Sequence, residues 1–212
     1  MRFDAAFGGL IPGASGVVLA ALLRTGSPMT GRQVHGLVRD QFSLWSVQQA
    51  LASLVGLGVV ESRTVGRAMV HTINEDHYAI QPLRVLLDPF AALREAAQRS
   101  VGSSVDAVIL FGSVARGEAT ADSDIDLAVL ASPDWDGRSA LEDAVRARLG
   151  NECDVLVFTP EEFSRLAASG DEPVVAKILA DGVFLLGALP QGPASDRFSI
   201  STPSQTTEPD VG

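Results

Sequence analysis

The chain has 212 residues, 46% of them hydrophobic and 20% charged, which is the composition of globular protein with room for two small domains. A single cysteine excludes an intramolecular disulfide, and the apolar run around Cys153 predicts a buried, unreactive thiol. The apolar run at 10–23 is too short to cross a bilayer and lacks the basic start and cleavage site of a signal peptide. These features predict a cytoplasmic protein without a membrane partner.

Charge is distributed unevenly along the sequence. Residues 1–100 hold nine Arg against seven acidic residues, whereas residues 101–212 hold seven basic residues against nineteen acidic ones. The resulting net charges of +2 and −12 indicate two units with different partners. The acidic half is poorly suited to nonspecific binding of nucleic acid, but it suits a site that concentrates divalent cations.

Three helices followed by two strands are predicted for the first 74 residues. The helices are expected at 15–24, at 31–38 and from 44 onward. Thr30 and Ser43 are the expected N-caps of the second and third helices. The strands 59–63 and 67–73 are expected to form a hairpin. This order resembles that of a winged helix-turn-helix, so 1–74 is interpreted as such a domain.

A helical connector and an α/β domain are predicted next. Residues 75–103 carry two prolines suited to first helical turns and a helical apolar stripe. In 104–187 apolar strands alternate with helices, and the strands are expected at 105–111, 125–131, 153–158 and 183–187. The Pro-, Ser- and Thr-rich residues 188–212 predict a disordered tail. The expected fold class is therefore a two-domain α/β (α+β) chain whose second domain has a sheet with flanking helices.

Residues with metal-binding and phosphate-binding chemistry gather at the ends of three predicted strands. Gly112 and Ser113 follow the first strand, ten residues separate Ser113 from Asp124, and Asp126 opens the second strand. Alternate residues of a strand share a face about 6.6–6.8 Å apart, so Asp124 and Asp126 converge, and Asp154 joins them from the third strand. Three neighbouring carboxylates repel one another, and a hard divalent cation relieves this repulsion. The pattern predicts a metal site.

The loop after the first strand suits a phosphate. Gly112 lets the backbone approach closely, and the following amides with the Ser113 hydroxyl can donate to phosphate oxygens. Arg116 on the same loop could clamp a triphosphate, and its alternative role is that of a solvated loop residue. Glu118 and Asp122 are interpreted as solvated loop residues.

The segment 112–127, with its Gly-Ser pair and Asp-x-Asp, resembles the signature of the polymerase-β-type nucleotidyltransferase superfamily, most closely the minimal nucleotidyltransferase (MNT) branch. The resemblance covers about 105–187 and implies a mixed sheet in which Gly112 and Ser113 contact NTP phosphate. It implies that Asp124, Asp126 and Asp154 hold two Mg²⁺ ions, with Mn²⁺ as a substitute, and that NMP is transferred with release of pyrophosphate.

The sequence does not identify the acceptor of the NMP group. MNT-like proteins resemble antitoxins that modify a partner toxin, so the resemblance implies AMP transfer from ATP to a HEPN-type toxin. Antibiotic and tRNA nucleotidyltransferases share the superfamily and are alternatives. A different class of function is a DNA-binding regulator or antitoxin that uses the nucleotidyltransferase fold only to bind a partner.

The first domain offers candidate DNA contacts on its third helix and its hairpin. A winged helix places its third helix in the major groove and its hairpin near the backbone. The candidates are Arg39, Ser43, Ser46, Gln49, Arg63 and Arg67. The third helix carries no basic residue, so the alternative is a helper domain for dimerisation or docking, and the oligomeric state is open. Trp45 is interpreted as an aromatic at the edge of the core.

Overall fold

The computed structural model describes residues 1–120 and 123–188, and the chain divides into two compact units between Ala91 and Ala92. Each unit has its own sheet, which confirms the mixed α/β class. Asp122 and the predicted tail after Ala188 lie outside the described residues. Within those residues, no helix is long and apolar enough to cross a membrane.

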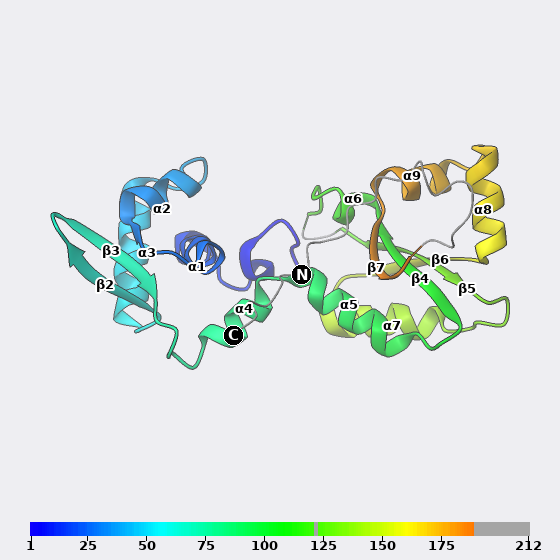
Figure 1. Cartoon of the computed structure of the whole chain (residues 1–212), viewed down its shortest axis with the longest axis horizontal. Helices are drawn as coiled ribbons and strands as arrows, with labels where there is room; N and C mark the ends of the chain where they lie inside the picture. The colour runs from blue at the N-terminus through cyan, green and yellow to red at the C-terminus, as the bar shows by residue number, and fades with distance from the viewer. Residues whose placement is uncertain (121–122, 189–212) are drawn as a thin grey trace, which may run out of the picture. The chain divides into compact units, whose positions relative to one another are not determined.

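Unit 1 (residues 1–91) combines helices with a small antiparallel sheet (Figure 1). Its elements are η1 (Ala6–Gly9), α1 (Gly13–Thr25), β1 (Met29–Thr30), α2 (Gly31–Val38), α3 (Leu44–Gly56), β2 (Val60–Val65), β3 (Ala68–Ile73) and α4 (Ile80–Leu86). Thr30 and Ser43 cap α2 and α3 as predicted, because their side chains accept bonds from Gln33 N and Ser46 N. Two-residue β1 was not expected, since so short a strand has no periodicity; it pairs with β3 and gives the order β1-β3-β2.

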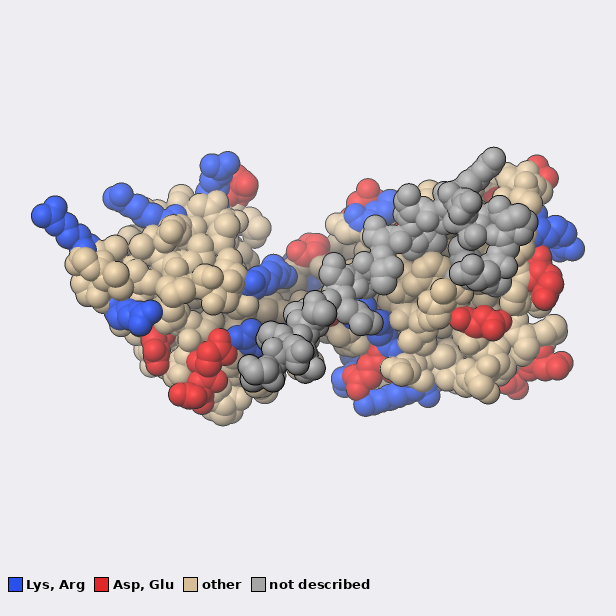
Figure 2. Space-filling view, viewed as in Figure 1, with Lys and Arg blue, Asp and Glu red and all other residues tan. Residues whose placement is uncertain are grey.

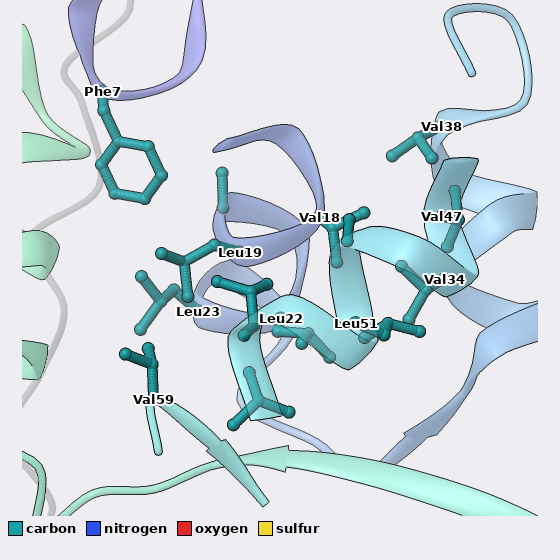
Figure 3. Packing of buried hydrophobic residues seen from close by; sticks show 14 of the residues in the cluster. Phe7, Val18, Leu19, Leu22, Leu23, Val34, Val38, Val47, Leu51 and Val59 are labelled. Atoms are coloured by element: carbon teal, nitrogen blue, oxygen red, sulfur yellow. The ribbon is translucent and has the colours of Figure 1, made fainter. Parts of the chain in front are cut away.

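The core of unit 1 forms where α1, α2 and α3 meet (Figure 3). The predicted stripe of α3 is buried at Val47, Leu51 and Leu54. Phe7 packs into the same core with 1% of its surface exposed, although its φ of 54° is left-handed. Such a backbone costs about 1–3 kcal/mol. Full burial of a phenylalanine side chain contributes about 1.5–3 kcal/mol, which offsets that cost.

The hairpin of unit 1 is longer than predicted. Strands β2 and β3 pair from Val60–Ile73 to Val65–Ala68, so Gly66 and Arg67 alone form the turn. Gly66 has a φ of 62°, which a residue with a side chain adopts only with strain. Beyond Val60 every residue of β2 is exposed, so the hairpin extends away from the core.

Unit 2 (residues 92–188) is built on a four-stranded mixed sheet of order β6-β5-β4-β7 (Figure 1). Its elements are the latter part of α5 (Pro89–Ser100), then β4 (Val105–Phe111), α6 (Gly112–Ala115), β5 (Ile125–Ala131), α7 (Arg138–Leu149), β6 (Cys153–Phe158), α8 (Pro160–Ser169), α9 (Pro173–Asp181) and β7 (Val183–Gly187). All four predicted strands occur at the expected residues. Pairing is parallel between β5 and β6 and antiparallel on both sides of β4.

Helices cover both faces of this sheet (Figure 1). On one face, α8 and α9 bury Phe163, Val175 and Ile178 against alternate residues of β4 and β5. On the other, α7 buries the predicted stripe Leu141, Val145 and Leu149. Glu95 of α5 pairs with Arg148 of α7 at 2.7 Å. Two helical layers explain why β4 and β5 are continuous apolar runs.

Candidate active site

Two of the three predicted carboxylates are neighbours across the parallel pair β5–β6. Asp126 and Asp154 are register partners in this pair. Ala128 and Leu130 alternate with Asp126 along β5 and belong to the core under α8 and α9, so Asp126 faces the same side. Asp124 lies one residue before β5 and is exposed. The register thus brings together residues that lie far apart in the sequence.

Burial and the neighbouring charges together change the pKa of Asp126. Burial raises the pKa of Asp126 above its ordinary value, and the negative charges of Asp154 and Asp124 raise it further. The positive charges of Arg116 and Lys177 act in the opposite direction. Ionised Asp126 therefore lies in an unfavourable field that a bound cation would relieve.

The carboxylates suit a hard cation in their chemistry. Oxygen ligands from carboxylates are those that Mg²⁺ prefers. In the described part of the chain, no three His, Cys, Asp or Glu side chains are grouped closely enough to hold a metal ion. Asp124 and Asp154 are exposed, so their side chains are free to turn toward an ion beside Asp126. The residues present fit Mg²⁺, provided that these two side chains rotate.

Gly112 provides the space that Asp126 occupies. Its φ is 75°, in the region that favours glycine. A Cβ added at this position would lie 2.1 Å from Oδ2 of Asp126, because Phe111 is the register partner of Asp126. No side chain fits there, so the turn after β4 keeps its backbone directly against the carboxylate.

The turn after β4 is a short helix, α6, which was not expected from the sequence. Backbone bonds close it: Arg116 N donates to Gly112 O at 3.2 Å, and Glu118 N donates to Ser113 O at 2.9 Å. Ser113 is half-buried in its first turn, next to Gly112. The predicted phosphate-binding residues therefore lie beside the acidic site.

Arg116 is held by two carboxylates. Its Nε donates to Glu118 Oε2 at 2.8 Å, and a terminal nitrogen donates to Asp181 Oδ2 at 3.2 Å. The second bond links the end of α6 to the end of α9. Glu118, interpreted as a solvated residue, is thus an ion-pair partner.

A family comparison bears on this region. Residues 93–187 match the family model described as "Polymerase beta, Nucleotidyltransferase". The match spans a little under half of the chain and includes the whole sheet of unit 2. All six predicted metal- and nucleotide-binding residues lie in this nucleotidyltransferase domain. A comparison with curated proteins finds no match.

Solved structures show weak likenesses. A toxin–antitoxin crystal structure with AMP-PNP is 21% identical, covering 47% of this chain and 73% of the other, at a TM-score of 0.36. A tri-AMPylated Shewanella oneidensis HEPN toxin in complex with an MNT antitoxin is 19% identical over the same shares, at a TM-score of 0.32. A HOP2 structure concerned with DNA recognition is 23% identical, covering 29% of this chain and 100% of the other, at a TM-score of 0.28.

Sequence reasoning missed Lys177 of α9. It is the only lysine of the chain, and its charge acts on Asp126 of the nucleotidyltransferase domain. No motif links the two residues, which lie 51 positions apart. The relevant signal is the packing of α9 on the sheet, which the sequence does not reveal.

The candidate DNA contacts of unit 1 lie mainly on its surface, where basic side chains project at the tip of the β2–β3 hairpin (Figure 2). The exposed candidates are Arg39, Ser43, Gln49, Arg63 and Arg67, whereas Ser46 is half-buried. The Ser43 hydroxyl is engaged as the cap of α3. Trp45 is 68% exposed, so its interpretation as a core-edge residue was wrong; it occupies the first turn of α3, on the polar side of the helix.

Proposed function

We propose that this chain is a Mg²⁺-dependent nucleotidyltransferase that transfers NMP from an NTP to an acceptor. The observation that carries the proposal is the register of β5 and β6, which sets Asp126 beside Asp154 and against Gly112. The family match of 93–187 supports the same activity. Because all three acids are retained, the proposal favours a catalytic domain over one that only binds a partner.

In the proposed reaction, the acidic residues bind the metal and the turn after β4 binds the phosphates. Asp124, Asp126 and Asp154 hold the metal. When bound, Mg²⁺ would supply positive charge that stabilises the negative charge developing on the phosphates during transfer. Gly112 allows backbone amides to approach the phosphates, and Ser113 donates its hydroxyl to a phosphate oxygen. The acceptor hydroxyl oxygen attacks the α-phosphorus and its proton is released to solvent. The bond between the α-phosphorus and the oxygen that bridges to the β-phosphorus breaks, and pyrophosphate leaves.

Arg116 is proposed to bind the triphosphate as well. To do so, the Arg116 guanidinium gives up its hydrogen bond to Glu118 or Asp181 and donates to a phosphate oxygen instead. A guanidinium presents donors in a fork that can keep one carboxylate while it binds a phosphate. The exposure of its side chain, 37%, makes this exchange accessible to a ligand.

The acceptor in this proposal is a protein hydroxyl, and the nucleotide is ATP. Residues 101–212 carry a net charge of −12, which would repel a polyanionic acceptor such as tRNA. An uncharged tyrosine hydroxyl is not repelled by this negative charge. The MNT resemblance of 112–127 points to a HEPN-type toxin as the partner.

Incubation with labelled ATP, Mg²⁺ and the product of the neighbouring gene tests this proposal. The expected result is a labelled partner that gains the mass of AMP, and no label with Asp126→Asn. Labelling of tRNA with the partner untouched would overturn the choice of acceptor. The absence of any AMP transfer would count against the enzyme.

A second function, DNA binding by unit 1, is favoured by its topology. The order α1-β1-α2-α3-β2-β3 with the sheet β1-β3-β2 supports the winged-helix interpretation of 1–74. Arg63 and Arg67 lie exposed on the hairpin that would contact the DNA backbone. Such binding would let the protein regulate its own gene.

A further inference from the structure

Helix α9 brings a basic side chain to the candidate active site. Val175 and Ile178 of α9 pack into the core on the sheet face that carries Asp126. Lys177 lies between them in sequence and is exposed. Helix α9 also contacts β4 and α6, the two elements that meet at Gly112.

An ion pair made by Asp181 shows which face of α9 is turned toward the loop after β4. Residues four apart on a helix share a face, so Lys177 and Asp181 lie on the same side of α9. Asp181 Oδ2 lies 3.2 Å from the Arg116 guanidinium, and Arg116 N is bonded to Gly112 O. The face of α9 that carries Lys177 is therefore the face turned toward α6.

The two cations near Asp126 differ in what already binds them. Arg116 shares its charge between Glu118 and Asp181. Lys177 makes no ion pair and no side-chain hydrogen bond with any described residue. An ammonium on a flexible stem is a mobile point charge, which is the form in which lysine binds phosphate.

We infer that Lys177 binds the β- and γ-phosphates of the NTP and holds the pyrophosphate as it leaves. This inference rests on the proposed nucleotidyl transfer and adds a substrate-binding residue to it. In this arrangement Arg116 gives up its bond to Glu118 and keeps its bond to Asp181, which ties α6 to α9. Lys177 supplies a positive charge that is not paired with a carboxylate of any described residue.

The test measures binding of AMP-PNP and of inorganic triphosphate, each with Mg²⁺, by titration calorimetry. Lys177→Ala should weaken both by about tenfold or more, the usual effect of losing a hydrogen bond to a charged group. The factor should be the same for both, because only phosphates touch Lys177. Lys177→Arg should restore most of the affinity.

Arg165→Ala is the matched control. Arg165 lies exposed on α8, in the same unit, and its removal changes the net charge equally. It should leave both affinities unchanged. Circular dichroism of each variant checks the fold, which an exposed substitution leaves intact.

Each contrary outcome is distinguishable. If Lys177→Ala binds AMP-PNP and triphosphate with wild-type affinity, the role of Lys177 is overturned and the proposed function stands. A loss that Arg165→Ala shares, or that Lys177→Arg does not restore, also overturns a direct contact. Failure of the wild-type chain to bind AMP-PNP with Mg²⁺ overturns the proposed function, and the inference with it.

Discussion

In unit 2, polar residues from separate parts of the sequence meet at one point, whereas in unit 1 they spread over an exposed surface. Gly112, Asp126 and Asp154 come together through strand register, and one added methyl group at Gly112 would collide with a carboxylate. Arg63 and Arg67 lie exposed on a hairpin that extends from its core.

This difference determines how each unit should respond to substitution. A site set by packing and register loses function when one atom is misplaced. A surface that acts through charge loses affinity in small, additive steps, each sensitive to salt. Single substitutions in unit 2 should therefore have large effects, and those in unit 1 small ones.

The largest effect is expected from Asp126→Asn. Transfer should fall by about a thousandfold or more, because several kcal/mol of metal-dependent stabilisation are lost. Thermal stability at pH 7 should hold or rise, since the substitution removes a half-buried charge that Asp154 and Asp124 repel. Activity assays and thermal melts check both results, and full activity would contradict the role of Asp126.

The pH dependence of that stability gain has a definite sign. Folding raises the pKa of Asp126 above its ordinary 3.8, so the ionised carboxylate destabilises the folded chain increasingly as pH rises. The gain from Asp126→Asn should therefore be present at pH 7 and should vanish below about pH 4. A gain independent of pH would show that it has another cause.

Gly112→Ala should have the next largest effect. The new Cβ would meet Oδ2 of Asp126 and would also occupy a left-handed backbone, at a cost of about 1–3 kcal/mol for the strain alone. Transfer should fall at least about tenfold because the metal ligand is displaced. Gly117→Ala is the control, since Gly117 has a similar φ of 72° and open space around it. Equal activity losses in the two variants would contradict the steric argument.

Removal of metal should weaken nucleotide binding. The triphosphate completes the oxygen ligands of Mg²⁺, so AMP-PNP should bind about tenfold or more weakly in EDTA. Titration with and without Mg²⁺ measures this change. Equal affinity in both conditions would count against the metal role of Asp124 and Asp154.

The smallest effect is expected in unit 1. Arg63→Ala with Arg67→Ala should weaken binding to the upstream DNA of the gene, and the slope of log affinity against log salt should fall by about 2. Gel shifts over a salt series measure it, with exposed Arg24→Ala as the control. If no upstream fragment shifts at low salt, unit 1 is a helper domain. The proposal that unit 1 binds DNA while unit 2 binds nucleotide and acceptor is then wrong.

Much of the local structure followed from the sequence alone. The four strands of unit 2 were predicted because each is an apolar run bounded by Gly, Pro or Asp. The caps at Thr30 and Ser43 were predicted because capping depends on residues within one turn. Burial of Cys153 was confirmed, and it raises the pKa of the thiol to about 12. Asp124 and Asp126 were predicted as metal ligands because Asp-x-Asp after Gly-Ser is a local pattern, and that role stays a prediction.

The tertiary structure decided which of these parts meet. The antiparallel pairing of β4 with both neighbours, and the register that joins Asp126 to Asp154, depend on contacts between distant segments. The bond from Arg116 to Asp181 and the approach of Lys177 to Asp126 depend on how α9 packs on the sheet. Periodicity reports which face of an element is buried, but not which partner buries it, so only the folded chain reveals these contacts.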